Sequence, residues 1–151
     1  MRLRRTTAIL TVAVLATILG LVAPTPAVAA ASHFNTDPYA TGCNNNAWII
    51  HTRYVGGGRL DTFYSGSCQT NWVQWSGPRT CTFKRVWTQA KGWNRWEKDY
   101  ASWSYSMQVY APGNTKIQVE YAVTPTSYPT CGRSAWDLAH EVGQHGWITL
   151  T

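Results

Sequence analysis

From Trp48 onward, short runs in which apolar residues recur at every second position alternate with turn residues. This period is typical of β-strands that bury one face. Trp48, Ile50, Thr52 and Tyr54 share one face of the first run, and glycines 56–58 separate it from a second run. The pattern predicts a mainly antiparallel, all-β domain of about seven strands, arranged as a small sandwich or barrel.

The strongest hairpin signal is the tetrapeptide Ala-Pro-Gly-Asn at 111–114, because its proline and glycine suit a type II turn. The runs 103–109 and 117–123 flank it with alternating apolar and polar residues. We expect these two runs to pair with each other. Their apolar face, which includes Trp103, then packs on the core, and their polar face, from Ser104 to Glu120, meets solvent.

One short helix is predicted near the end of the chain. Ser134 and Asp137 resemble a capping box, and Gly143 is a natural helix stop. Residues 145–151 read as a closing strand. The apolar residues at helical spacing between these signals are Ala135, Leu138, Ala139 and Val142.

The first 29 residues have the pattern of a secretory signal peptide. Arginines within 2–5 precede an apolar run at 8–22, and prolines with small residues follow at 24–29. The apolar run is shorter than the roughly 20 residues that cross a membrane. We therefore expect cleavage near 29–31, no stable membrane anchor afterwards, and a single secreted domain over 32–151.

Charge gives little support to a nucleic-acid partner. Three of the thirteen Lys and Arg residues lie in the predicted signal, which leaves ten against seven Asp and Glu, a net charge of +3. Nucleic-acid-binding domains are usually more basic. We expect no nucleic acid among the partners.

The four cysteines lie in the predicted secreted part, at Cys43, Cys68, Cys81 and Cys131. An even number in a small exported domain indicates two disulfides, for which three pairings are possible. A hairpin at glycines 56–58 brings the first two cysteines together, so we favour Cys43 with Cys68 and Cys81 with Cys131. Their spacing lacks the C-x2-C pair of common zinc sites, and we expect no metal or cofactor.

Part of the chain resembles a known family. The segments Asp37–Cys43, glycines 56–58 and Tyr64–Trp72 follow the order D-P-x-x-T-G-C, a glycine-rich hairpin and R-Y-S-x-x-C-x-x-x-W. This order, matched over about residues 37–72, resembles the family called domain of unknown function 2690, although Phe63 stands at its arginine position. The family occurs in actinobacterial exported and membrane-tethered proteins. The resemblance implies an extracytoplasmic β domain and brings no catalytic residues.

Catalytic motifs are poorly supported. His140 and His145 almost match the zinc-protease pattern H-E-x-x-H, but a spacing of five places them about 140° apart on a helix. Glu97 and Asp99 share a strand face but alternate with Arg95 and Lys98, as in a salt-bridged surface. The chain has no G-x-S-x-G motif. We predict no catalytic residues and no enzyme activity.

Nine tryptophans remain to be explained. Trp48, Trp72, Trp87 and Trp103 alternate with apolar neighbours and are expected in the core. Turn residues place Trp93, Arg95 and Trp96 near a loop tip, where exposed rings stack on sugars. These three are the predicted ligand-binding residues, with burial of both rings at a hairpin end as the structural alternative.

The leading hypothesis is a secreted, non-catalytic domain that binds polysaccharide or cell-envelope surfaces through exposed aromatic rings. The first alternative is a module that binds another extracellular protein, such as a protease inhibitor acting through the loop 124–130. The second is a small secreted hydrolase.

Overall fold

The computed structural model describes residues 32–125, 128 and 130–151, so the predicted signal peptide and part of the loop 124–130 lie outside the described residues. The fold is a curled, eight-stranded antiparallel sheet with one short helix, which confirms the predicted class. No helix in the described residues is long and apolar enough to cross a membrane. The elements are β1 (Ala47–Val55), β2 (Gly58–Ser65), β3 (Thr70–Thr88), β4 (Gly92–Trp93), β5 (Glu97–Tyr105), β6 (Val109–Tyr110), β7 (Ile117–Val123), α2 (Arg133–Glu141) and β8 (His145–Leu150).

The long strand β3 organises the sheet. Its first half pairs with β2 and its second half with β7, while β5 pairs with much of the opposite edge. The halves meet at residues 77–79, where the pairing register with β5 shifts. Gly77 is required there because a Cβ atom would lie 2.6 Å from the Cα of Gly58. This close approach lets β3 bend and the sheet curl.

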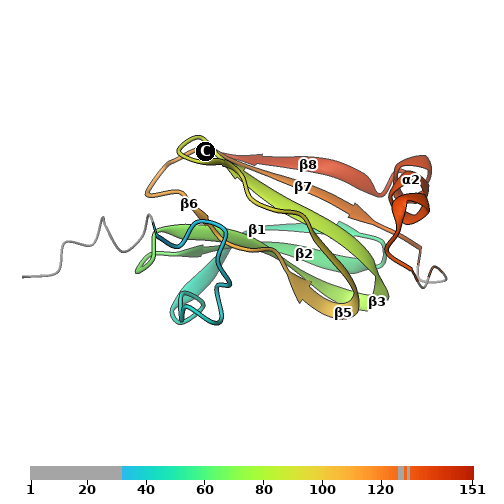
Figure 1. Ribbon diagram of the computed structural model, residues 1–151, viewed down its shortest axis with the longest axis horizontal. Helices are drawn as coiled ribbons and strands as arrows, with labels where there is room; N and C mark the ends of the chain where they lie inside the picture. Colours follow the sequence, from blue (N-terminus) through green and yellow to red (C-terminus); the bar gives the residue numbers. More distant parts are fainter. Residues whose placement is uncertain (1–31, 126–127, 129) are drawn as a thin grey trace, which may run out of the picture.

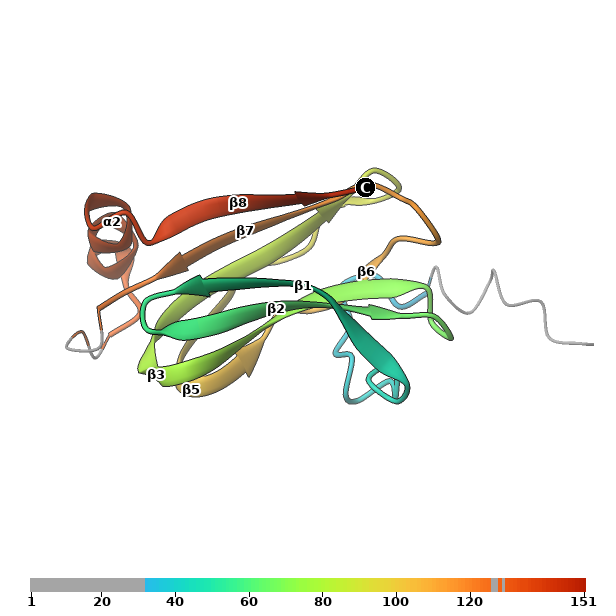
Figure 2. The same ribbon diagram turned by 180° about the vertical axis from the view of Figure 1, so that it is seen from behind.

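The curl brings the two ends of β3 to the same short strand. Thr70 pairs with Tyr110 of β6, and the Thr88 hydroxyl at the other end donates to the Tyr110 carbonyl at 2.9 Å. The strand pairs β1–β2 and β7–β8 consequently form two layers (Figures 1 and 2). The main core, which includes Leu60, Trp75 and Tyr121, draws its buried side chains from both layers. Burial of these large side chains is the main stabilising contribution.

Local chemistry explains the first hairpin and both cross-links. Gly56 and Gly57 have positive φ values, 57° and 76°, as the tight turn between β1 and β2 requires. The disulfides are Cys43–Cys68 and Cys81–Cys131, which confirms the predicted pairing. The first joins the entry of β1 to the β2–β3 turn, and the second joins β3 to the segment before α2.

The predicted hairpin around 111–114 is wrong. The turn exists, with Gly113 at φ 56°, but it connects β6 to β7. The runs that flank it both pair with β3 instead of with each other. Alternation shows which residues share a face of a strand, but it carries no information about which strand lies beside it.

The faces predicted for 103–109 are also partly wrong. Trp103 is 47% exposed, whereas Ser104, Ser106 and Gln108 are buried. Each of these three buried side chains has a hydrogen-bond partner. The Ser106 hydroxyl, for example, accepts the Val73 N–H at 3.1 Å. Buried polar side chains are tolerated here because they form hydrogen bonds that the backbone pairing of the sheet leaves unmade.

The helix is confirmed, but its predicted cap is not. The N-cap residue is Gly132, and no side chain caps the helix. Ser134 lies inside the helix, where its hydroxyl accepts from Tyr128 at 2.8 Å. Gly143, with φ 68°, follows the helix end as predicted.

Candidate functional site

The open end of the curled sheet carries a cleft, here called the end cleft. Trp48 of β1 pairs with Tyr64 of β2, and Tyr64 pairs with Asn71 of β3. Directly paired residues point to the same face of a sheet, so these side chains form one row. The same face of β2 carries the buried Leu60. The row is thus the continuation of the core-facing surface, and it ends at Trp48, which is 51% exposed.

The second wall of the end cleft comes from the other layer. Ile117 of β7 pairs with Leu150 of β8, and the turn at 113–115 lies beside them. The cleft encloses about 390 Å³. The C-terminal end of β8, which lines the cleft, lies at the end of the molecule opposite α2 (Figures 1 and 2). Ligand sites are common at such mouths of closed or curled sheets.

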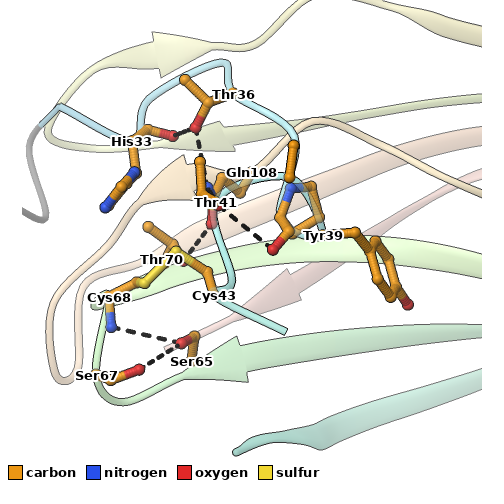
Figure 3. The surroundings of a disulfide bond; sticks show 12 residues. His33, Thr36, Tyr39, Thr41, Cys43, Ser65, Ser67, Cys68, Thr70 and Gln108 are labelled. Atoms are coloured by element: carbon orange, nitrogen blue, oxygen red, sulfur yellow. Dashed lines mark hydrogen bonds between the residues drawn. A yellow bond between two sulfur atoms is a disulfide. The ribbon is translucent and has the colours of Figure 1, made fainter. Parts of the chain in front are cut away.

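A polar network braces the segment that leads into the first wall (Figure 3). The buried side chain of Gln108 accepts from the Thr70 hydroxyl at 2.7 Å and donates to those of Thr36 and Thr41 at 2.9 and 2.8 Å. The Cys43–Cys68 disulfide closes the same region. This network and cross-link hold the start of β1, and with it Trp48, in a defined position.

The end cleft has the chemistry of a site for an uncharged ligand. No Asp, Glu, Lys, Arg or His is among its described lining residues. The ring centroids of Trp48 and Tyr64 lie 5.1 Å apart at an interplanar angle of 76°, so the rings form a corner. The Tyr64 hydroxyl accepts the Gly113 N–H at 3.4 Å, which leaves its proton free to be donated to a ligand. The lining residues are Trp48, Ile50, Tyr64, Asn71, Gly113, Asn114, Thr115, Ile117, Leu150 and Thr151.

The predicted ligand-binding residues lie elsewhere. Trp93 and Trp96 are half-buried and hold the guanidinium carbon of Arg85 between them, 4.2 and 4.4 Å from the ring centroids. Arg85 also pairs with Glu120 at 2.6 Å. Arg95 is exposed, and its Nε pairs with the carboxylate of Glu97 at 2.6 Å. One face of each ring is covered by a cation, so the pair is not an open, coplanar platform, and a ligand-binding role for it remains a prediction.

The two histidines of the near-miss protease motif meet in space. The chain reverses after Gly143, and β8 returns His145 to His140, with ring centroids 3.8 Å apart and an interplanar angle of 24°. A spacing of five residues separates the two rings only when both lie on one helix, whereas His145 lies on β8. Rings stacked nearly in parallel do not direct their nitrogen lone pairs at one point, as zinc ligation requires.

A buried lysine is the most unusual polar residue that sequence reasoning missed. The Lys84 side chain is 0% exposed, and its ammonium donates to Asp99 at 2.7 Å and to hydroxyls of Thr82 and Ser104 at 3.0 and 2.8 Å. Burial lowers the pKa of Lys84, and the Asp99 carboxylate opposes that shift. All three ammonium protons have acceptors, so the group is a satisfied structural cation.

The side chains of the end cleft were not among the predicted ligand-binding residues. The face predicted for Trp48, Ile50, Thr52 and Tyr54 is wrong, and so is the predicted burial of Trp48. A β-bulge between Ile49 and His51 puts Trp48 on the face of Leu60, whereas Thr52 and Tyr54 pair with Asp61 and Arg59 on the other face. The row with Tyr64 and Asn71 exists only through pairing across three strands. The glycine hairpin alone did not reveal this row, because its register would place Trp48 opposite Ser65. The β-bulge shifts the pairing of Trp48 to Tyr64.

A scan against protein-family models finds no matching family, and searches of curated proteins and of solved structures find no similar protein. The resemblance to the domain of unknown function 2690 family is neither supported nor contradicted by these comparisons, and it stays a prediction.

Proposed function

We propose that this protein is a secreted, non-catalytic domain that binds an uncharged polysaccharide in the end cleft. The observation that carries the proposal is the composition of the cleft: a corner of two aromatic rings, beside amide and hydroxyl groups and without charged side chains. Sugar rings present apolar C–H faces that pack on aromatic rings and hydroxyls that bond to amides. Two disulfides support the secreted location, because they persist in oxidising compartments.

The shape of the cleft favours the end or the edge of a glycan chain over its flat face. The Trp48 and Tyr64 rings are nearly perpendicular, so one sugar contacts both rings only by entering the corner between them. The opposite wall is apolar at Ile117 and Leu150. Specificity then rests on Asn114 and on the Tyr64 hydroxyl, which line the cleft, because the amide nitrogen of Asn71 already donates to the Phe63 carbonyl at 3.0 Å.

The test is sedimentation of the oxidised protein with insoluble cellulose, chitin and purified peptidoglycan. Binding is measured at low salt and at about 0.5 M salt, where charge interactions are screened within a few ångströms. We expect binding to at least one polymer that survives high salt, because no charged side chain contributes to the cleft.

The decisive variant is Trp48→Ala, with Trp147→Ala as its matched control. Trp147 of β8 is 52% exposed, as much as Trp48, but it lies outside the end cleft. We expect Trp48→Ala to abolish sedimentation and Trp147→Ala to leave it intact, since one aromatic stacking contact is worth about 1–3 kcal/mol. Equal loss in both variants, or binding that high salt removes, would contradict the proposal.

A further inference from the structure

A second cavity lies at the opposite end of the molecule, between α2 and the sheet. We call it the helix-end cavity; it encloses about 220 Å³. Trp136 of α2 stands nearly perpendicular to Trp96 and to Phe83, with ring centroids 4.9 and 5.4 Å apart. Three aromatic rings thus form its walls. Its lining residues are Phe83, Trp96, Lys98, Cys131, Gly132, Arg133 and Trp136.

The walls are held in place from behind. Ala135 and Ala139 of α2 are fully buried against Phe83 and its neighbours. The Cys81–Cys131 disulfide ties β3 to the segment before the helix. Arg85 packs on the ring of Trp96. A cavity with walls held in this way loses little entropy when a ligand enters, which favours binding.

The charge at the rim of the helix-end cavity is positive. Lys98 pairs across the strands with Phe83 and so lies on the cavity face of the sheet. In the described part of the chain, Lys98 has no ion-pair partner, whereas Arg133 pairs with Asp137 at 3.1 Å. One unpaired ammonium therefore borders an aromatic cavity. Its complement is a small molecule that has both a flat apolar body and an anionic group.

We infer that the helix-end cavity is a binding site for a small organic anion, an aromatic carboxylate or sulfonate. The flat body packs against the aromatic wall that Phe83, Trp96 and Trp136 form, and the anionic group pairs with Lys98. This site is independent of the end cleft, because the two share no lining residue. Residues of α2 line one and the C-terminal end of β8 lines the other, and these elements lie at opposite ends of the molecule (Figure 1).

The probes are 2-naphthoate and its uncharged counterpart 2-naphthylmethanol, titrated into the oxidised protein by calorimetry. We expect naphthoate to bind about fivefold more tightly than the alcohol, the size of one partly exposed charge interaction. Lys98→Gln removes the charge without enlarging the cavity. It is expected to weaken naphthoate about fivefold and to leave the alcohol unchanged.

Two controls separate this site from others. Lys91→Gln removes an exposed lysine that does not line the cavity, and it is expected to change nothing. Trp48→Ala destroys the end cleft and should leave naphthoate binding intact. Four results would each overturn the inference: no saturable naphthoate binding, equal affinity for both probes, equal effects of Lys98→Gln and Lys91→Gln, or loss of naphthoate binding in Trp48→Ala.

Discussion

The two ends of this molecule use the same residue type in opposite ways. At the open end, the half-exposed ring of Trp48 contacts the Tyr64 ring edge to face in a cleft whose described lining has no charged side chains. Around Trp96, which lines the helix-end cavity, the guanidinium of Arg85 lies over the rings of Trp96 and Trp93, and the adjacent Lys84 is buried with Asp99 as its counterion. An aromatic ring beside a cation gains a cation–π interaction of about 0.5–2 kcal/mol, but the face it uses is no longer available to a ligand. Exposure on its own is therefore a poor guide to binding, and the neighbours of each ring decide what it does.

The largest expected effect on the free energy of unfolding comes from removing either of the two disulfides. Replacing Cys81 and Cys131 together by Ser opens a loop of 50 residues, and replacing Cys43 and Cys68 opens one of 25. On the chain-entropy model these changes lower the free energy of unfolding by about 4 and about 3.5 kcal/mol. Urea unfolding of the two double variants measures both. A larger loss for the Cys43–Cys68 pair would show that the open end depends more on its cross-link than the helix end does.

The second prediction concerns the buried lysine near the helix end. Asp99→Ala leaves the Lys84 ammonium buried without a counterion, so we expect a loss of about 3 kcal/mol in the free energy of unfolding. Lys84→Met is expected to cost about 1 kcal/mol, because the remaining Asp99 is partly hydrated. The hydroxyls of Thr82 and Ser104 already bond to each other at 3.1 Å, so they keep a partner when the ammonium is removed. Urea unfolding that showed the lysine variant to be the less stable would refute this account of the pair.

The third prediction is a pH dependence of the free energy of unfolding, which arises from Tyr105 and its contact with Asp37. Burial raises the pKa of Tyr105 to about 12, and its hydrogen bond to Asp37 at 3.0 Å adds to the shift. In the unfolded chain this phenol ionises near pH 10. The unfolded chain therefore loses its proton first, so the stabilisation is fully present below pH 10 and is lost as the pH rises through about 12.

Tyr105→Phe removes this titration. We expect the variant to lose less stability than the unmodified protein between about pH 9 and about pH 11.5, measured by urea unfolding. Tyr54→Phe is the control, because Tyr54 is 77% exposed. Identical pH profiles for the unmodified protein and Tyr105→Phe would refute the prediction.

The smallest effect is expected at Gly66, which lies beside the Trp48 ring. A Cβ atom there would lie 3.2 Å from the edge of that ring, so Gly66→Ala must displace the ring by a few tenths of an ångström. We expect the free energy of unfolding to change by less than about 0.5 kcal/mol, as for most surface substitutions. Polysaccharide sedimentation should fall about twofold. The control is Gly132→Ala, where a Cβ would meet open space. If this variant lowered sedimentation as much as Gly66→Ala, the effect would not come from Trp48.

Sequence reasoning succeeded where the information was local. Two adjacent glycines are sufficient to predict the β1–β2 hairpin, and that hairpin brings Cys43 to Cys68. It failed where partners are distant. The predicted pairing of 103–109 with 117–123 ignored β3, which lies between them, and the helical spacing of His140 and His145 did not reveal that β8 would bring the rings together.

The same difference between local and distant information applies to the candidate sites. Composition predicts exposed tryptophans, and the structure confirms exposed aromatic rings, but at Trp48, Trp103 and Trp147 instead of at the loop that carries Trp93. The cation between Trp93 and Trp96 comes from Arg85, eight residues before Trp93 and on another strand. No local pattern marks such a contact, since the side chains meet only after β4 has paired with β3.

The sequence by itself determined the all-β class, the first hairpin, the Cys43–Cys68 disulfide and the short helix, because each depends on backbone preferences or on residues joined by one turn. The Cys81–Cys131 pairing then followed because only these two cysteines remained. The tertiary structure alone decided which aromatic rings face solvent. That outcome depends on the bend of β3 at 77–79, which curls the sheet, covers Leu60 and leaves Trp48 at the open end. The bend is a property of strands paired across long sequence separations, and alternation within one strand carries no record of it.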